Sequence, residues 1–155
     1  MKMRLIIALF LILSPSFAHA ADAVALDSSV FVERMVAAEG GKSRMVLEEP
    51  KIVTPGDRLV FVLQYHNTGA QPAKDFVVTN PMPGPVAYLG TNDTFAQVSI
   101  DGGRTFGTLA TLKVKDTDGQ LRAARPEDVT HVRWALRDPI AAGGQGKLSF
   151  RGIVR

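Results

Sequence analysis

Acidic residues spaced like the ligands of a calcium loop occur in the segment DTDGQLRAARPE, residues 116–127. The oxygen-bearing side chains at loop positions one, three, five and twelve are those of Asp116, Asp118, Gln120 and Glu127. Ca²⁺ prefers such oxygen ligands, but position six of the loop requires glycine for a sharp turn, and Leu121 stands there. The main interpretation is therefore a turn beginning at Asp118-Gly119, and a weak surface calcium site is the alternative.

A second motif that could carry chemistry is SIDGGRTF, residues 99–106, which fits the Asp-box pattern S-x-D-x-G-x-T-[WF]. It resembles the repeats of sialidase-type propellers, and this resemblance implies glycoside cleavage. Such enzymes have several copies in a much longer chain, with clustered arginines and a tyrosine nucleophile, whereas this chain has one copy. The main interpretation is a hairpin in which Asp101 accepts local amide hydrogen bonds, Gly103 adopts a positive φ and Phe106 packs beneath the turn. A carbohydrate-binding or glycan-hydrolysing loop is the alternative.

Histidine and methionine are the remaining residues that could hold a metal ion. Beyond residue 20 they are His66, His131, Met35, Met45 and Met82. This set resembles, at a distance, the Met/His sites of periplasmic copper chaperones, which need a His and a Met two residues apart. His66 is followed by Asn67 and Thr68, so solvated strand histidines are the main interpretation and periplasmic metal binding is a lower alternative. A G-x-S-x-G elbow is also missing from the sequence. We therefore predict no catalytic residue, no cofactor and no enzyme.

The first 20 residues have the three parts of a secretory signal peptide. They comprise a short basic region with Lys2 and Arg4, the unbroken apolar run LIIALFLIL (5–13), and the small-x-small pattern Ala18-His19-Ala20. An apolar run of this length is too short to span a bilayer. We therefore expect cleavage after Ala20, no membrane insertion of the remaining chain, and a periplasmic or secreted protein.

Composition excludes several classes of function. The chain has no cysteine, which excludes disulfides, thiol catalysis, thiolate metal sites and a lipid-modified cysteine. Cleavage after Ala20 would leave 16 of the 18 basic residues against all 15 acidic ones, a net charge of +1. So nearly neutral a chain gives no reason to expect nucleic acid as a partner.

Short runs of β-forming residues, separated by Gly, Pro, Asn and Asp, make up the rest of the chain. The predicted strands are residues 30–37, 44–48, 58–66, 75–79, 86–89, 96–100, 108–115, 129–136 and 147–154. This pattern predicts an all-β fold, an immunoglobulin-like antiparallel β-sandwich of about seven to nine strands. It forms one domain over residues 30–155 after a flexible leader over 21–29, with a helical turn at Pro126.

Alternation along two strands predicts which residues enter the core. In THVRWALRD, Trp134 shares one strand face with Val132 and Leu136, so we expect it to be buried between the sheets. The aromatic residues expected near it are Phe61, Tyr65, Phe76 and Phe150.

The most organised stretch runs from Pro55 to Gly84, PGDRLVFVLQYHNTGAQPAKDFVVTNPMPG. Pro55, Gly56 and Asp57 form a tight turn, and the strand after it is apolar on both faces, which predicts a central strand. Asn67 ends that strand, and Gly69 is expected to take the positive φ of a turn back. The prolines at 81, 83 and 85 lack amide donors, so that segment must leave the sheet or follow an edge.

The order of these motifs resembles the bacterial conserved-repeat domain, a domain of unknown function (number eleven). The resemblance is strongest over residues 55–89, with a PGD turn, an aromatic-bearing strand, Asn-x-Gly and a Val-rich strand ending in Asn-Pro. It implies an immunoglobulin-like sandwich in secreted or surface proteins, without recognised catalytic residues. This chain departs from the family in having one copy and insertions at 99–106 and 116–129.

These observations together predict an exported, non-catalytic module with a structural or protein-interaction role in the cell envelope. Sheet edges and Gly- and Pro-rich loops are the features by which such a module binds. The expected partner is an unidentified envelope or surface protein.

Overall fold

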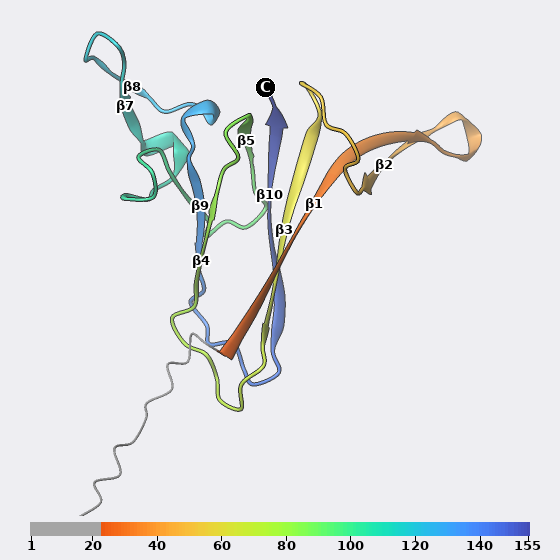
Figure 1. The fold of residues 1–155 in the computed structure, drawn as a ribbon, viewed down its shortest axis with the longest axis vertical. Helices are drawn as coiled ribbons and strands as arrows, with labels where there is room; N and C mark the ends of the chain where they lie inside the picture. Colours follow the sequence, from red (N-terminus) through yellow and green to blue (C-terminus); the bar gives the residue numbers. More distant parts are fainter. Residues whose placement is uncertain (1–22) are drawn as a thin grey trace, which may run out of the picture.

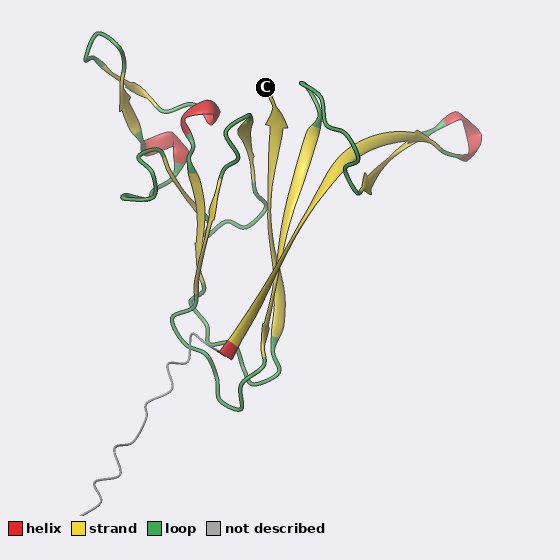
Figure 2. Cartoon of the chain, in the orientation of Figure 1, coloured by secondary structure: helices red, strands yellow, loops and turns green. Residues whose placement is uncertain are grey.

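The computed structural model describes residues 23–155, and the predicted signal peptide with its cleavage site lies outside them. Within these residues the chain consists of strands and loops, with a few short 3₁₀ turns (Figure 2). Two antiparallel sheets face each other, and a two-stranded hairpin projects beside the smaller one (Figure 1). The prediction of an all-β sandwich of antiparallel sheets is confirmed.

The larger sheet has the strand order β2-β1-β3-β10-β5. Its strands are β1 (Val24–Ala37), β2 (Ser43–Glu48), β3 (Arg58–Asn67), β5 (Val86–Gly90) and β10 (Gln145–Val154). The smaller sheet has the order β4-β9-β6, and its strands are β4 (Val77–Pro81), β6 (Gln97–Ser99) and β9 (His131–Ala135). The projecting hairpin is formed by β7 (Lys113–Lys115) and β8 (Leu121–Ala123).

Strand β3 is central in its sheet, as its apolar pattern predicts, because it pairs with β1 on one side and β10 on the other. Its residues 59–63 are all buried. Phe61 belongs to the core between the sheets. Val60 points to the outer face, where its neighbours across the ladder are Phe31 and Arg151.

The core between the two sheets is built around Trp134 of β9 and Phe150 of β10, both fully buried. Their ring centroids lie 6.0 Å apart, and Phe150 stacks on Phe61 of β3 with centroids 4.5 Å apart. Tyr65 and Phe76 form a further tilted pair, 5.9 Å between centroids. The aromatic residues expected near Trp134 therefore extend across both sheets, and they hold the sheets together by apolar burial.

Residues 24–29 are a correction to the predicted flexible leader of 21–29. They form the first part of β1, in register with β3 from Val24 opposite Asn67 to Ser29 opposite Val62. Their side chains are largely exposed, so burial does not hold this segment in place. Backbone pairing with the central strand β3 holds it in place. Because this pairing does not require buried side chains, the sequence shows no apolar alternation here.

Two other predicted elements differ from the structure, and one strand, β8, was not predicted. Residues 109–111 of the predicted strand 108–115 form a 3₁₀ turn, because Oγ1 of Thr111 donates to the carbonyl of Thr108 at 2.9 Å and closes a local loop. Strand β4 begins at Val77, two residues late, after Asp75 with its positive φ of 53°. Strand β8 is only three residues long, too short for alternation to show.

The far end of β1 leaves the sandwich with β2. Pairing of β1 with β3 ends at Val32, and residues 32–37 pair with β2 instead. We call this hairpin the arm: residues 32–37 of β1, the 3₁₀ turn Glu39–Gly41, and β2. The arm projects away from the facing sheets (Figure 1).

Candidate functional site

The Pro55-Gly56-Asp57 turn connects three strands. The amide of Asp57 donates to the carbonyl of Thr54 at 3.0 Å, and Gly56 has a φ of 94°, which fits a type II turn with proline before glycine. The Asp57 carboxylate accepts from Arg34 of β1 at 2.6 Å and from the amide of Thr54 at 2.9 Å. These two partners hold the pKa of the Asp57 carboxyl below its usual value.

Backbone bonds attach the same turn to β10. The amide of Gly56 donates to the carbonyl of Val154 at 2.8 Å, and the amide of Val154 donates to the carbonyl of Asp57 at 3.0 Å. The PGD motif therefore ties the start of β3 to β1 through a side chain and to β10 through the main chain. Both carboxylate oxygens of Asp57 accept hydrogen bonds from these neighbouring segments.

Asn67 joins the two loops at the opposite end of β3, and its side chain is fully buried. Its Nδ2 donates to the carbonyls of Gln71 at 2.8 Å, Ile140 at 2.9 Å and Ala141 at 3.1 Å. Its Oδ1 accepts from the amide of Gly69 at 3.0 Å. Asn67 is therefore a structural hub, and a buried amide is suited to this role because it both donates and accepts.

Gly69 has a different role from the one predicted. Its φ is not positive, so the expected left-handed turn is wrong. Glycine is needed because a Cβ here would lie 2.7 Å from the Cβ of Ala23 and 3.2 Å from Oδ1 of Asn67. The close approach of the start of β1 excludes any side chain.

The Asp-box-like loop is held by its own aspartate. Oδ1 of Asp101 accepts from the amides of Arg104 and Thr105 at 3.0 and 2.9 Å, and Oδ2 accepts from Oγ1 of Thr105 at 2.6 Å. Ser99 donates to Oδ1 from its hydroxyl at 2.7 Å. Hydrogen bonds from Thr105, Ser99 and Arg104 hold the pKa of the Asp101 carboxyl well below its usual value. The carboxylate is thus ionised and fully engaged within its loop.

The other two predicted residues of this motif, Gly103 and Phe106, lie against side chains of β9. Gly103 has a φ of 85°, and a Cβ there would meet the ring of His131 at 3.6 Å. Phe106 is partly buried, and the guanidinium of Arg133 lies over its ring, with Cζ 4.9 Å from the centroid. Phe106 therefore packs against a β9 side chain, and the loop is anchored on the smaller sheet.

The predicted calcium segment forms the β7–β8 hairpin. The amides of Asp118 and Gln120 donate to Oδ1 of Asp116 at 3.1 and 2.8 Å, and Gly119 has a φ of 78°, as a turn beginning at Asp118-Gly119 requires. Asp128 is paired with Arg122 at 2.6 Å, and this pairing lowers the pKa of the Asp128 carboxyl to about 2. Among residues 23–155, no three acidic or histidine side chains form a group that could hold a metal ion.

The histidines and methionines considered as copper ligands lie in different surroundings. His66 is exposed on β3, whereas His131 packs beside Gly103 and its Nδ1 lies 3.1 Å from Oγ1 of Thr130. Met35 and Met45 are opposite each other on the arm. Met82 packs against the core, and its amide donates to the carbonyl of Thr130, next to His131, at 2.8 Å. The arm methionines Met35 and Met45 lie on a different part of the fold from His131.

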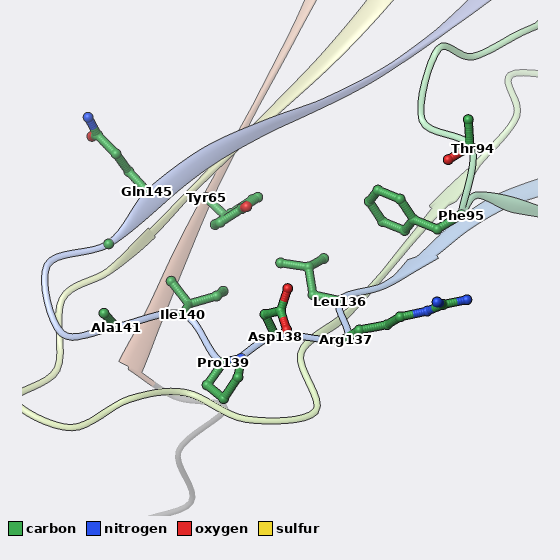
Figure 3. A pocket seen from close by; sticks show the side chains of 11 residues that line it. Tyr65, Thr94, Phe95, Leu136, Arg137, Asp138, Pro139, Ile140, Ala141 and Gln145 are labelled. Atoms are coloured by element: carbon green, nitrogen blue, oxygen red, sulfur yellow. The ribbon is translucent and has the colours of Figure 1, made fainter.

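A cavity of about 560 Å³ opens at the end of the sandwich where Asn67 binds the loop before β10 (Figure 3). Tyr65 and Phe95 lie on opposite sides of it, with Leu136 between them (Figure 3). Asp138 is the one carboxylate of its lining, so the pair of carboxylates that glycoside hydrolysis uses is not formed there. None of the predicted site residues lines this cavity. Phe95 lies in a loop without alternation, so the sequence carried no signal for it.

Exposed apolar side chains concentrate on the arm and the segment that follows it. Of the ten exposed large apolar residues among those described, five lie between residues 35 and 53. They are Met35, Met45, Leu47, Ile52 and Val53. Met35, Met45 and Leu47 are 63%, 53% and 51% exposed, and they share one face of the arm. Sequence reasoning identified these strands but did not find that the arm leaves the sandwich.

Asp93 carries a carboxylate with long-range contacts that the sequence did not reveal. Its Oδ2 accepts from Nε1 of Trp134 at 3.0 Å and from the amide of Ser149 at 3.2 Å. A lone aspartate in the sequence TNDT carries no signal for such a contact. Its partners are structural, since both belong to the strands that form the core.

No helix within residues 23–155 is long and apolar enough to cross a membrane. Comparison of the chain with family models, with curated proteins and with solved structures found no match.

Proposed function

We propose that this chain is an exported, non-catalytic β-sandwich module that binds a partner protein in the cell envelope. The observation that carries the proposal is the concentration of exposed apolar side chains on the arm and on residues 49–53. Apolar side chains that cluster on one projecting surface are typical of protein-binding sites. Export is supported by the basic, apolar and small-x-small pattern of residues 1–20.

The engagement of the polar motifs supports a non-catalytic role. The carboxylates of Asp57 and Asp101 and the amide of Asn67 all have their hydrogen-bonding atoms occupied by neighbouring chain segments. A general acid, base or nucleophile needs an atom that can reach a substrate. The resemblance of residues 55–89 to the conserved-repeat domain leads to the same proposal.

A cross-linking capture from the envelope tests this function. The tagged chain is exported by producing cells, cross-linked, and purified under denaturing conditions, and the attached proteins are identified. We expect a partner other than the chain itself to be captured by the wild type and lost in Met35→Ser/Leu47→Ser. The matched control is Leu121→Ser, which removes an equally exposed apolar side chain from the β7–β8 hairpin. Capture that is the same in both variants would contradict the proposal.

A second candidate function is carbohydrate binding, and the cavity of Figure 3 favours it over the Asp-box-like loop. The rings of Tyr65 and Phe95 offer apolar faces, and Asp138 and Gln145 offer hydrogen-bonding groups for hydroxyls. Titration of the chain with envelope oligosaccharides, followed by NMR, tests this candidate. Shifts confined to the cavity residues and abolished by Phe95→Ala would favour it over the first proposal.

A further inference from the structure

Strand β2 is an edge strand whose outer side is uncovered. It pairs with β1 alone among the described residues. The segment that follows crosses back over β1, where Glu49 to Ile52 line a shallow cavity together with Val32 and Arg34. The outer backbone groups of Ser43–Glu48 are therefore free to pair with another strand.

The sequence of this edge is complementary to itself when two copies run antiparallel. Centring the pair on Val46 places Arg44 opposite Glu48 of the second copy and Met45 opposite its Leu47. Two-fold symmetry repeats both pairs, so the contact contains two pairs of opposite charge and two apolar pairs. Within residues 23–155 neither Arg44 nor Glu48 has an ion-pair partner.

Such a pairing also places apolar side chains of both copies on the same face of the joined sheet. Met45 lies opposite Met35 on the arm, and Leu47 lies opposite Glu33. Rows across the contact would run Met35, Met45 and then Leu47 of the second copy, so the most exposed apolar side chains of the arm cover one another. Glu33 at the end of each row already binds Arg151 at 2.8 Å, so no unpaired charge is brought into the row.

We propose that two copies of this chain associate by antiparallel pairing of their β2 strands, centred on Val46. The two larger sheets then become one continuous sheet, because β2 is the outermost strand of each. Pro50 lacks an amide donor, so the ladder ends there. The projection of the arm keeps the two sandwiches apart (Figure 1). The inference goes beyond the proposed function, because it names a second copy of this chain as one partner of the arm.

Charge reversal at the two ends of the contact tests it. Sedimentation of the purified exported chain over a concentration series in the micromolar range should show a monomer that converts to a dimer. Arg44→Glu places two like-charge pairs in the contact, and the dissociation constant should rise by roughly tenfold or more. Glu48→Arg should do the same. The double variant Arg44→Glu/Glu48→Arg restores both pairs, so its dimer should match the wild type.

A mixture of the two single variants provides the sharpest readout. Each fails to pair with itself, but an Arg44→Glu chain and a Glu48→Arg chain are complementary at both ends, so the mixture should form a heterodimer. Lys113→Glu, a charge reversal at an exposed position on β7, is the control and should leave the dimer unchanged. Thermal melts of every variant verify folding, and Met45→Ser weakens the same contact through its apolar row.

Three results would overturn the inference: a wild type that stays monomeric, single variants that dimerise as well as the wild type, or a mixture that does not associate. A monomeric wild type whose arm still captures an envelope protein leaves the proposed function intact. A dimer that captures no other protein overturns the proposed function and leaves the β2 contact standing.

Discussion

The indole Nε1 of Trp134 donates to Oδ2 of Asp93 at 3.0 Å, across 41 residues of sequence. The same oxygen accepts from the amide of Ser149 at 3.2 Å, and Thr91 holds the loop in place by donating to the carbonyl of Ser149 at 2.5 Å. One carboxylate thus connects the loop after β5 to β9 and β10, the two strands that supply the most deeply buried aromatic rings.

Removing this carboxylate should destabilise the fold. Asp93→Ala leaves the buried indole N–H and the amide of Ser149 without an acceptor, and we expect a loss of about 1–3 kcal/mol in the free energy of unfolding. In a Trp134→Phe background the same substitution should cost less, since the indole donor is already gone. Urea unfolding of the four proteins measures this coupling. Equal losses in both backgrounds would show that the Trp134–Asp93 contact contributes nothing.

Asn67 should tolerate no carboxylate. Asn67→Asp keeps an acceptor for Gly69 but turns the donations to Gln71, Ile140 and Ala141 into contacts between acceptors. We expect a loss of more than about 2 kcal/mol at neutral pH, because a buried charge faces carbonyl oxygens. Burial raises the pKa of the introduced carboxyl, so part of the loss should be recovered as the pH falls. Chemical unfolding at two pH values measures both effects.

The control for that experiment is Asn80→Asp on the edge strand β4. The amide of Asn80 makes a single bond, to the carbonyl of Pro81 at 2.9 Å. Its substitution should change stability little. An Asn67→Asp protein as stable as this control would show that the loop hub is not required.

The Asp-box-like loop should affect folding and not turnover. Asp101→Ala removes the acceptor that Ser99, Arg104 and Thr105 share, so the melting temperature should fall. Gly103→Val should lower it as well, since valine is strained at a φ of +85°. The wild type should hydrolyse neither sialosides nor envelope glycans. Hydrolysis that is lost in an Asp101→Ala protein with an unchanged melting temperature would mean that the loop is catalytic.

Acid should weaken the fold between about pH 4 and pH 2. The pKa values of Asp57 and Asp101 are lowered in the fold, and that of Asp128 is lowered to about 2. A carboxyl with a lowered folded-state pKa adds stability above its unfolded-state pKa, and that stability is lost as the pH falls through the folded-state value.

Melting temperatures across this range measure the effect. The slope should become shallower in Arg122→Gln, which removes the partner of Asp128. A melting temperature that does not change down to pH 2 would contradict the linkage.

The predictable parts of this fold are those in which burial leaves a period in the sequence. An apolar run on both faces identified β3 as a central strand, and the alternation around Trp134 placed its ring in the core. Residues 24–29 could not be found in this way, because backbone pairing alone holds them and their side chains face solvent.

The residues of the candidate site also divide into those that a local sequence pattern reveals and those that it does not. Local motifs revealed Asp57 and Asp101 because each accepts a hydrogen bond from an amide within a few residues. The bond from Arg34 to Asp57, 23 residues apart, was not predicted. The contact of Asp93 with Trp134 could not be predicted, since nothing in the neighbouring residues signals a partner 41 positions away. The role of Gly69 depends on the approach of Ala23, which only the assembled sheet reveals.

The position of β10 governs when this chain can fold. The strand formed by residues 145–154 lies between β3 and β5, so the larger sheet stays split until that segment leaves the ribosome. Before that point β5 has no neighbour in its sheet, and Phe61 lacks the ring on which it stacks. Pairing between β3 and β10 also closes a long stretch of chain, which slows folding. The larger sheet is therefore completed late, by a strand that must insert between two segments made well before it.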